Sequence, residues 1–222
     1  MEDKKEKYLL IDKPEGWTSF DVVSVIRRQA RLETSNKKIR VGHAGTLDPF
    51  ATGLLIVGVG REATKHLDDF KKLSKTYQAT VRLGTISDTD DPTGTLSVTE
   101  TDKMIDRAEI EIVLKKFIGD QTQIPPMYSA KKINGQILYK LARAGKTVER
   151  QPHHIIIYNI RLTGYTWPDL TIEVDCSAGT YIRTLAHDIG DALGVGAYCH
   201  ALRRTKIGDY KIEDAEKIEK FK

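Results

Sequence analysis

The amino-acid sequence predicts an α+β fold, with a mixed, mainly antiparallel central sheet flanked by helices. Strand-like segments are joined by hairpin turns in some places and by helical segments in others, which favours a mixed sheet over a purely parallel one. The 222 residues are 40% hydrophobic and 30% charged, with 7 Pro and 17 Gly. This composition is typical of a globular chain and excludes collagenous or wholly disordered proteins. We expect a single domain with a sizeable core.

The first part of the chain provides three predicted strands and one predicted helix. Residues 8–12 (YLLID) form a buried strand that ends at a Lys-Pro-Glu-Gly turn. Ser19 is predicted to cap a helix whose apolar residues recur three to four positions apart. Residues 54–59 are a continuous apolar run, as expected of a strand buried on both faces. Residues 78–84 alternate between apolar and polar, which predicts a strand with one buried face.

The second part alternates helices with a hairpin. Apolar residues over 103–118 show helical spacing, at Ile105, Ala108, Ile112 and Phe117, and predict a helix. Residues 154–165 and 169–176 are predicted to pair as a hairpin. Another helix is predicted to begin near residue 181, and the charged tail from residue 212 onward is predicted to form a short helix.

One segment, 124–152, lies between two well-patterned elements and does not resemble core. It begins at Pro125-Pro126, and we interpret it as an exposed insertion. Residues 131–150 carry one acid and six basic residues, a charge of +5 against +4 for the whole chain. The basic residues are Lys131, Lys132, Lys140, Arg143, Lys146 and Arg150. Such a face suits a polyanionic partner, although charge runs are more often simply solvated surface.

The densest unusual stretch is residues 40–55, RVGHAGTLDPFATGLL. Its glycines allow tight bends or a close approach of a substrate. Asp48 precedes Pro49, so its backbone is biased away from helix and its carboxylate is held in a loop before the buried strand. This is a suitable position for a catalytic carboxylate, but Asp-Pro is also an ordinary turn pair.

A second candidate is the stretch from residue 176 to residue 190, CSAGTYIRTLAHDIG. Thr180 is a suitable helix N-cap, which places Arg183 in the first helical turn. A cation there faces the positive end of the helix dipole, so Arg183 needs a partner, which a buried carboxylate would provide. The alternative is that Arg183 simply reaches solvent.

Several other function classes find no support in the sequence. The histidines and cysteines match no metal-ligand spacing, and the GVGREATK segment lacks the glycine and lysine pattern of a phosphate loop. Neither a membrane-spanning run nor an export signal is present, so we expect a cytoplasmic protein with reduced cysteines.

Seven blocks of sequence, in order, resemble TruB-type tRNA pseudouridine synthases, which isomerise the uridine at position 55 of the tRNA T-loop. The blocks are KPEGWTSF, VGHAGTLDPFATGLL, REATK, KTYQATVRLG, IPPMYSAKKINGQILYKLARAG, CSAGTYIRTLAHDIG and LRRTKIG. They extend from about Leu9 to about Ala215, nearly the whole chain. The resemblance implies the pseudouridine synthase fold, with residues 124–152 as an RNA-binding insertion.

The resemblance also implies a role for each matching residue. Asp48 falls on the catalytic aspartate, Arg183 on the arginine that pairs with it, and Tyr77 on the tyrosine that stacks on the target base. Residues implied to bind substrate are His43, Tyr181, Leu202, Arg40, Lys65, Lys131, Lys132 and Arg143. Lys13 and Pro14 match a motif with a structural role.

These assignments imply a cofactor-free and metal-free isomerase that acts on the T stem-loop of tRNA, as a monomer. Bacterial members usually continue into a small C-terminal RNA-binding domain of the PUA type, whereas this sequence ends at Lys222, so we expect the catalytic domain without it. Two alternatives stay open: a synthase subunit that depends on a guide RNA or a partner, and a catalytically idle tRNA-folding or tRNA-binding protein. Retention of Asp48 and Arg183 argues against the idle protein.

Overall fold

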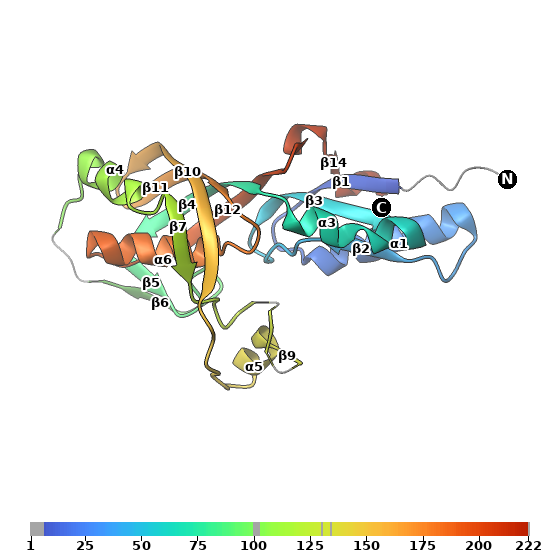
Figure 1. The fold of residues 1–222 in the computed structure, drawn as a ribbon, viewed down its shortest axis with the longest axis horizontal. Helices are drawn as coiled ribbons and strands as arrows, with labels where there is room; N and C mark the ends of the chain where they lie inside the picture. Colours follow the sequence, from blue (N-terminus) through green and yellow to red (C-terminus); the bar gives the residue numbers. More distant parts are fainter. Residues whose placement is uncertain (1–6, 100–102, 130, 134, 222) are drawn as a thin grey trace. The chain divides into compact units, whose positions relative to one another are not determined.

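The computed structural model describes residues 7–99, 103–129, 131–133 and 135–221. The chain forms two compact units, one made of residues 1–77 and 203–222 and the other of residues 78–202. Two strands, β4 (Lys75–Leu83) and β12 (Ala197–Ile207), each begin in one unit and end in the other. The colour bar of Figure 1 locates each segment.

The sheet of the first unit is centred on β3. Its other members are β1, β2 and β14, the C-terminal part of β12, and β13, which pairs with β12. Strand β3 is antiparallel to β1 and β2 and parallel to β12, while β1 is parallel to β14. The bounds are β1 (Lys7–Lys13), β2 (Val41–Ala44), β3 (Thr52–Val59), β13 (Tyr210–Lys211) and β14 (Glu216–Lys217).

Helices cover both faces of this sheet. The buried side chains of α1 (Ser19–Thr34) pack with Ile11, Leu55 and Val57 on one face. The alternate residues Leu54 and Ile56 pack on the other face against Leu67, the first residue of α3 (Leu67–Lys72), which follows α2 (Arg61–Lys65). The continuous apolar run in β3 is therefore buried on both sides, as its composition predicts.

The start of α1 differs from the prediction that Ser19 caps it. The N-cap is Thr18, whose hydroxyl accepts the Asp21 N–H while the Asp21 carboxylate accepts the Thr18 N–H. This reciprocal arrangement is a capping box, in which a residue three positions into the helix completes the cap. The Ser19 hydroxyl is directed instead to Leu47 in the loop between β2 and β3.

The second unit contains the predicted hairpin. Strands β10 (His153–Thr166) and β11 (Asp169–Cys176) are antiparallel, and the sheet order is β4-β11-β10-β7. All four apolar residues on one face of β11 are buried: Leu170, Ile172, Val174 and Cys176. Other strands of this unit are β7 (Gly119–Gln123) and β5 (Thr85–Ser87), which pairs with β6 (Leu96–Val98). The predicted mixed, mainly antiparallel sheet is confirmed.

Two helices accompany this sheet. Helix α6 (Ile182–Leu193) begins close to the predicted position, and α4 (Arg107–Lys115) contacts both α6 and β10. The predicted apolar spacing does not mark the buried side of α4. Ala108 and Ile112 are exposed, and the buried residues are Ile110, Val113 and Leu114. The helix is capped by Asp106, so Ile105 lies outside it and the helical spacing cannot be counted from Ile105.

The insertion has ordered secondary structure. Strands β8 (Lys132–Ile133) and β9 (Gln136–Ile137) form a hairpin followed by α5 (Leu138–Arg143), and these elements project from the sheet of the second unit (Figure 1). Leu138 is fully buried, and its N–H donates to Lys131 O. The segment contains both exposed and buried residues, and Pro125, Pro126, Ser129 and Leu138 are buried.

The C-terminal tail does not form the predicted helix. It comprises a 3-10 turn η1 (Ile212–Asp214), β14, and a second 3-10 turn η2 (Ile218–Phe221). Ile218 is fully buried and Phe221 packs on the same core cluster as α1. Burial of these apolar side chains determines the conformation of the tail more strongly than its charged residues do. In the described part of the chain, no helix is long and apolar enough to cross a membrane.

Candidate active site

The loop between β2 and β3 holds Asp48 with a fixed backbone on both sides. Before it, the Ser19 hydroxyl accepts the Leu47 N–H at 2.9 Å and donates to Leu47 O at 3.2 Å. After it, Pro49 O accepts the Gly16 N–H at 2.8 Å. Because both neighbouring peptide groups are bonded to the start of α1 or to the turn before it, the half-buried Asp48 has little freedom to move.

Arg204 holds the two ends of this loop together. It is 1% exposed, and its guanidinium donates to Leu54 O at 2.8 Å and to Gly45 O at 3.0 Å. Gly53 has φ +106° and faces the Arg204 backbone so closely that a Cβ would overlap it. A glycine is therefore required here for β3 to approach β12.

Lys13 lies beneath the same loop. Its ammonium donates to Pro14 O at 2.9 Å, Trp17 O at 2.6 Å and Pro49 O at 3.3 Å. Burial lowers the pKa of Lys13 to about 8, and attraction to Asp48 is the strongest effect opposing that decrease. The ammonium is therefore mostly charged at neutral pH, and it both holds the loop and attracts the Asp48 carboxylate.

The side chain of His43, in β2, is a neutral ring with one nitrogen that makes no hydrogen bond within the described residues. Burial, followed by the charges of Lys71 and Arg204, lowers its pKa to about 4, so the ring is uncharged at pH 7. Its Nδ1 is buried and has no hydrogen-bond partner within the described residues. A buried polar atom in this condition is costly unless a ligand bonds to it.

In the second unit, Arg183 is 3% exposed and lies in the first turn of α6. Its guanidinium donates to Thr89 O at 3.0 Å, to Asp91 Oδ2 at 3.1 Å and to Tyr128 O. The sequence predicts that a cation at this position needs a buried carboxylate as its partner, and Asp91 is such a carboxylate. The alternative, that Arg183 reaches solvent, is wrong.

Asp91 is a site residue that the sequence analysis did not identify. Besides Arg183, its carboxylate accepts hydrogen bonds from the Thr89 hydroxyl at 2.8 Å and the Thr93 N–H at 2.9 Å. Asp91 precedes Pro92, which gives the same dipeptide as Asp48-Pro49. The recurrence of the Asp-Pro pair is the sequence feature that could have indicated Asp91.

The predicted aromatic and apolar contacts are divided between the units. Tyr77 is half-buried in β4 of the first unit. Tyr181 is the N-cap of α6 in the second unit, so the prediction that Thr180 caps this helix is wrong. The Gln123 side chain bonds both the N–H and the O of Tyr181, at 2.9 and 3.1 Å, which replaces a side-chain cap. Leu202 lies in β12 and is 9% exposed.

The predicted basic contacts lie on the surface or in the insertion. Arg40 is exposed directly before β2, whereas Lys65 ends α2 in an ion pair with Glu62 at 2.6 Å. Lys131 is half-buried, Lys132 lies in β8 and Arg143 ends α5. Lys65 is therefore already neutralised by a neighbour, but the pair is exposed and a phosphate could exchange for the carboxylate.

Comparison with known proteins identifies the family. The profile of the N-terminal domain of TruB family pseudouridylate synthases matches residues 31–182. The chain is 44% identical over 221 residues to tRNA pseudouridine synthase B of Phocaeicola vulgatus, covering 100% of this chain and 94% of that relative. The chain belongs to the TruB family. A second profile, the C-terminal domain of tRNA pseudouridylate synthase B, matches residues 183–222.

Other TruB relatives and solved structures agree. The Opitutus terrae tRNA pseudouridine synthase B is 44% identical over 207 residues, covering 93% of this chain and 83% of its own length. A crystal structure of a Cbf5-Nop10-Gar1 complex contains a chain that is 30% identical, with a TM-score of 0.73 over 96% of this chain. This protein spans 52% of that longer chain. The pseudouridine synthase fold is confirmed, and the protein is an isomerase of the TruB family.

Proposed function

We propose that this protein converts uridine 55 in the tRNA T-loop to pseudouridine, with Asp48 as the nucleophile. Relatives named tRNA pseudouridine synthase B support tRNA as the substrate. The observation that carries the proposal is the fixed position of Asp48, whose neighbours Leu47 and Pro49 are both bonded to other elements. A nucleophile held in one geometry needs no reorganisation before it attacks.

The reaction rearranges bonds without oxidation or reduction. The Asp48 carboxylate attacks the nucleotide, either at the sugar or at the base, and the N1–C1′ glycosidic bond breaks. The base turns and C5 bonds to C1′, after which C5 loses its proton, N1 gains one and the carboxylate is released. Every bond that breaks is matched by one that forms. The residues of the active site therefore need only to hold the base and protect the reactive intermediate. Both points of attack fit this balance.

Other residues would hold the flipped nucleotide. The uridine must leave its stack before Asp48 reaches it, and an aromatic ring and an apolar wall stabilise an extruded base. Tyr77, Tyr181 and Leu202 have side chains suited to that role. The unpartnered Nδ1 of the neutral His43 is available to a polar group of the T-loop.

We further propose that the Arg183 guanidinium meets the Asp48 carboxylate in the RNA-bound enzyme. The hydrogen bonds that Arg183 makes to Asp91, Thr89 O and Tyr128 O fix its charge on α6, and a fixed cation can hold a carboxylate ionised and oriented. A crystal structure with bound RNA tests this pairing. A separation of more than about 8 Å between the charged groups, too far even for a water bridge, would refute it.

The function is tested by release of tritium from a tRNA transcript labelled at C5 of its uridines, with this protein alone. We expect release from the transcript and none from a matched transcript with cytidine at position 55. Equal release from both transcripts would refute the T-loop position. Release that requires added cellular RNA or protein would refute a stand-alone enzyme in favour of a guide- or partner-dependent subunit. No release under either condition would refute the activity.

A further inference from the structure

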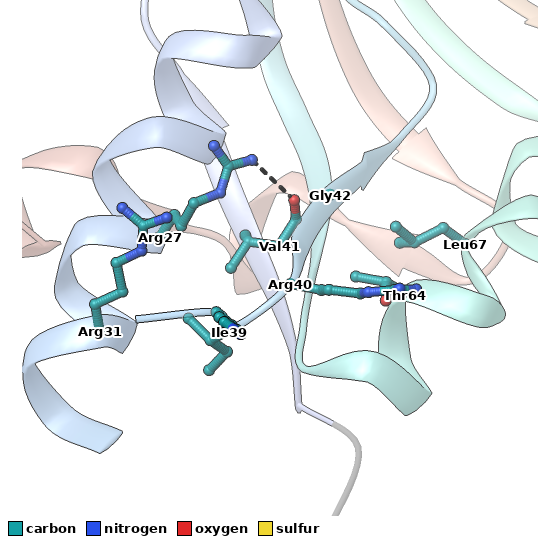
Figure 2. Close-up of a pocket in the computed structure, with 9 residues that line it drawn as sticks. Arg27, Arg31, Ile39, Arg40, Val41, Gly42, Thr64 and Leu67 are labelled. Carbon is teal, nitrogen blue, oxygen red and sulfur yellow. Dashed lines mark hydrogen bonds between the residues drawn. The ribbon is translucent and has the colours of Figure 1, made fainter. Parts of the chain in front are cut away.

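A basic pocket lies in the first unit, between α1, the loop that follows it, β2, and helices α2 and α3 (Figure 2). Its volume is about 540 Å³, and none of the described residues that line it carries a carboxylate. Four of the lining residues are cationic: Arg27, Arg31, Lys38 and Arg40. Below, "the basic pocket" means the space lined by these four residues together with Ile39, Val41, Gly42, Thr64 and Leu67.

The charges of the basic pocket are not neutralised within the described residues. None of its four cations lies within ion-pair distance of a carboxylate there, whereas Lys65, Lys71 and Lys72 on the adjacent helices each pair with an acid. Four like charges gathered without counter-charges repel one another. This repulsion is relieved when an anion enters.

One of the four cations is held in place. Arg27 is half-buried, donates to Val41 O at 3.2 Å and lies over the Phe20 ring at 5.5 Å. Arg31 follows one helical turn later, so both guanidinium groups project from the same side of α1, as Figure 2 shows. Arg40 extends toward Thr64 from the strand side. The arrangement presents guanidinium groups, which suit phosphate oxygens, from two directions.

The floor of the basic pocket is small and aliphatic. A Cβ at Gly42 would lie 3.0 Å from Leu67, so the absence of a side chain leaves the space open. The uncharged lining consists of Ile39, Val41, Gly42, Thr64 and Leu67, with no aromatic ring to stack a base. Such a lining recognises a phosphate without reading the base attached to it.

We propose that the basic pocket binds a phosphate of the substrate RNA backbone. The proposal rests on the proposed function for the identity of the RNA. Gly42, which lines the pocket, directly precedes His43 in β2. Arg40 lies three residues before His43, so at about 3.3 Å per residue its backbone is about 10 Å from that of His43. An RNA strand whose loop contacts His43 can therefore reach the pocket with a neighbouring part of its backbone.

The test neutralises two of the three exposed cations of the basic pocket, Arg31 and Lys38, and includes a matched control. Arg31→Gln with Lys38→Gln changes the pocket, and Arg28→Gln with Lys37→Gln removes the same charge from adjacent exposed positions on the same helix and loop that do not line it. Binding to full-length tRNA is measured from 50 to 400 mM salt. The slope of log affinity against log salt should fall by about 0.8 per lost phosphate contact, with about tenfold weaker binding per contact near 0.1 M salt.

Each result decides the proposal. A reduced slope for the pocket variant and a near-normal slope for the control supports it. Equal losses in both variants would show a general electrostatic field, and no loss in the pocket variant would show that RNA passes elsewhere; either result overturns it. The proposed function is judged separately by wild-type tritium release. If wild-type protein binds tRNA through the pocket yet releases no tritium, only the proposed function fails.

Discussion

Replacing Asp91 with Asn should destabilise the second unit and slow turnover together. Arg183 and Asp91 have side chains 4% and 7% exposed, and the carboxylate also holds Thr89 and Thr93. Removing one partner of a buried ion pair costs about 3–5 kcal/mol, because the other charge is left without compensation. The Asn side chain retains one oxygen that accepts a hydrogen bond, and Arg183 retains its hydrogen bonds to Thr89 O and Tyr128 O. We therefore expect the free energy of unfolding to fall by the lower end of this range, about 3 kcal/mol. For a chain of this size the midpoint of thermal unfolding should fall by roughly 6–12 °C.

The assay follows unfolding in urea by tryptophan fluorescence. Trp17 belongs to the first unit and Trp167 to the second, so a Trp17→Phe background makes Trp167 report the second unit alone. The control is Asp88→Asn on the same loop, where an exposed carboxylate accepts the Thr95 N–H at 2.8 Å and Asn preserves that acceptor. We expect the control to lose less than about 1 kcal/mol. Equal shifts for the two variants would refute the buried-pair argument.

Three further predictions follow from local geometry. Ser19→Ala removes both bonds to Leu47 and should lower kcat several-fold while KM for tRNA changes little, as steady-state kinetics would show. His187, which faces Asp90, Asp191 and Asp188, has its pKa raised to about 9, chiefly by its hydrogen bond to Asp90. This contribution to folding is full below pH 6.5 and is lost as the pH rises through 9. As the pH rises through that range, the free energy of unfolding in urea should therefore decrease more for wild type than for His187→Gln. The difference should be only on the order of 1 kcal/mol, because solvent screens this partly exposed pair. Neutralising four insertion cations should flatten the salt dependence of tRNA binding by roughly one slope unit per lost contact and leave saturated turnover nearly unchanged, measured by filter binding and tritium release. These four are Lys131, Lys132, Arg143 and Lys146.

The parts of the fold that the sequence predicts are those where burial alone decides. The continuous run at 54–59 and the alternation at 169–176 depend only on which side chains avoid water, and both strands are confirmed. The failures concern elements decided by hydrogen bonds or by distant packing. Thr18 rather than Ser19 caps α1, because Asp21 lies three positions after Thr18 and completes the capping box. The C-terminal tail does not form a helix, because its conformation buries Ile218.

The candidate site likewise contains residues indicated by local motifs and residues indicated only by long-range contacts. Local patterns make Asp48 and Arg183 candidates, and the resemblance to TruB-type synthases gives each of them an expected role. Asp91, Ser19 and Arg204 support them through contacts with residues far away in the chain, such as Arg183, Leu47 and Leu54. Only the folded structure brings these pairs together, so a local pattern cannot reveal them.

The most direct test of the central claim compares Asp48→Asn with wild type in tritium release under single-turnover conditions. The variant should bind tRNA nearly as tightly as wild type, because phosphate contacts dominate affinity and lie elsewhere. It should release no tritium above background, because the nucleophile is gone. Measurable release by Asp48→Asn at saturating enzyme would contradict the assignment of Asp48 as the nucleophile.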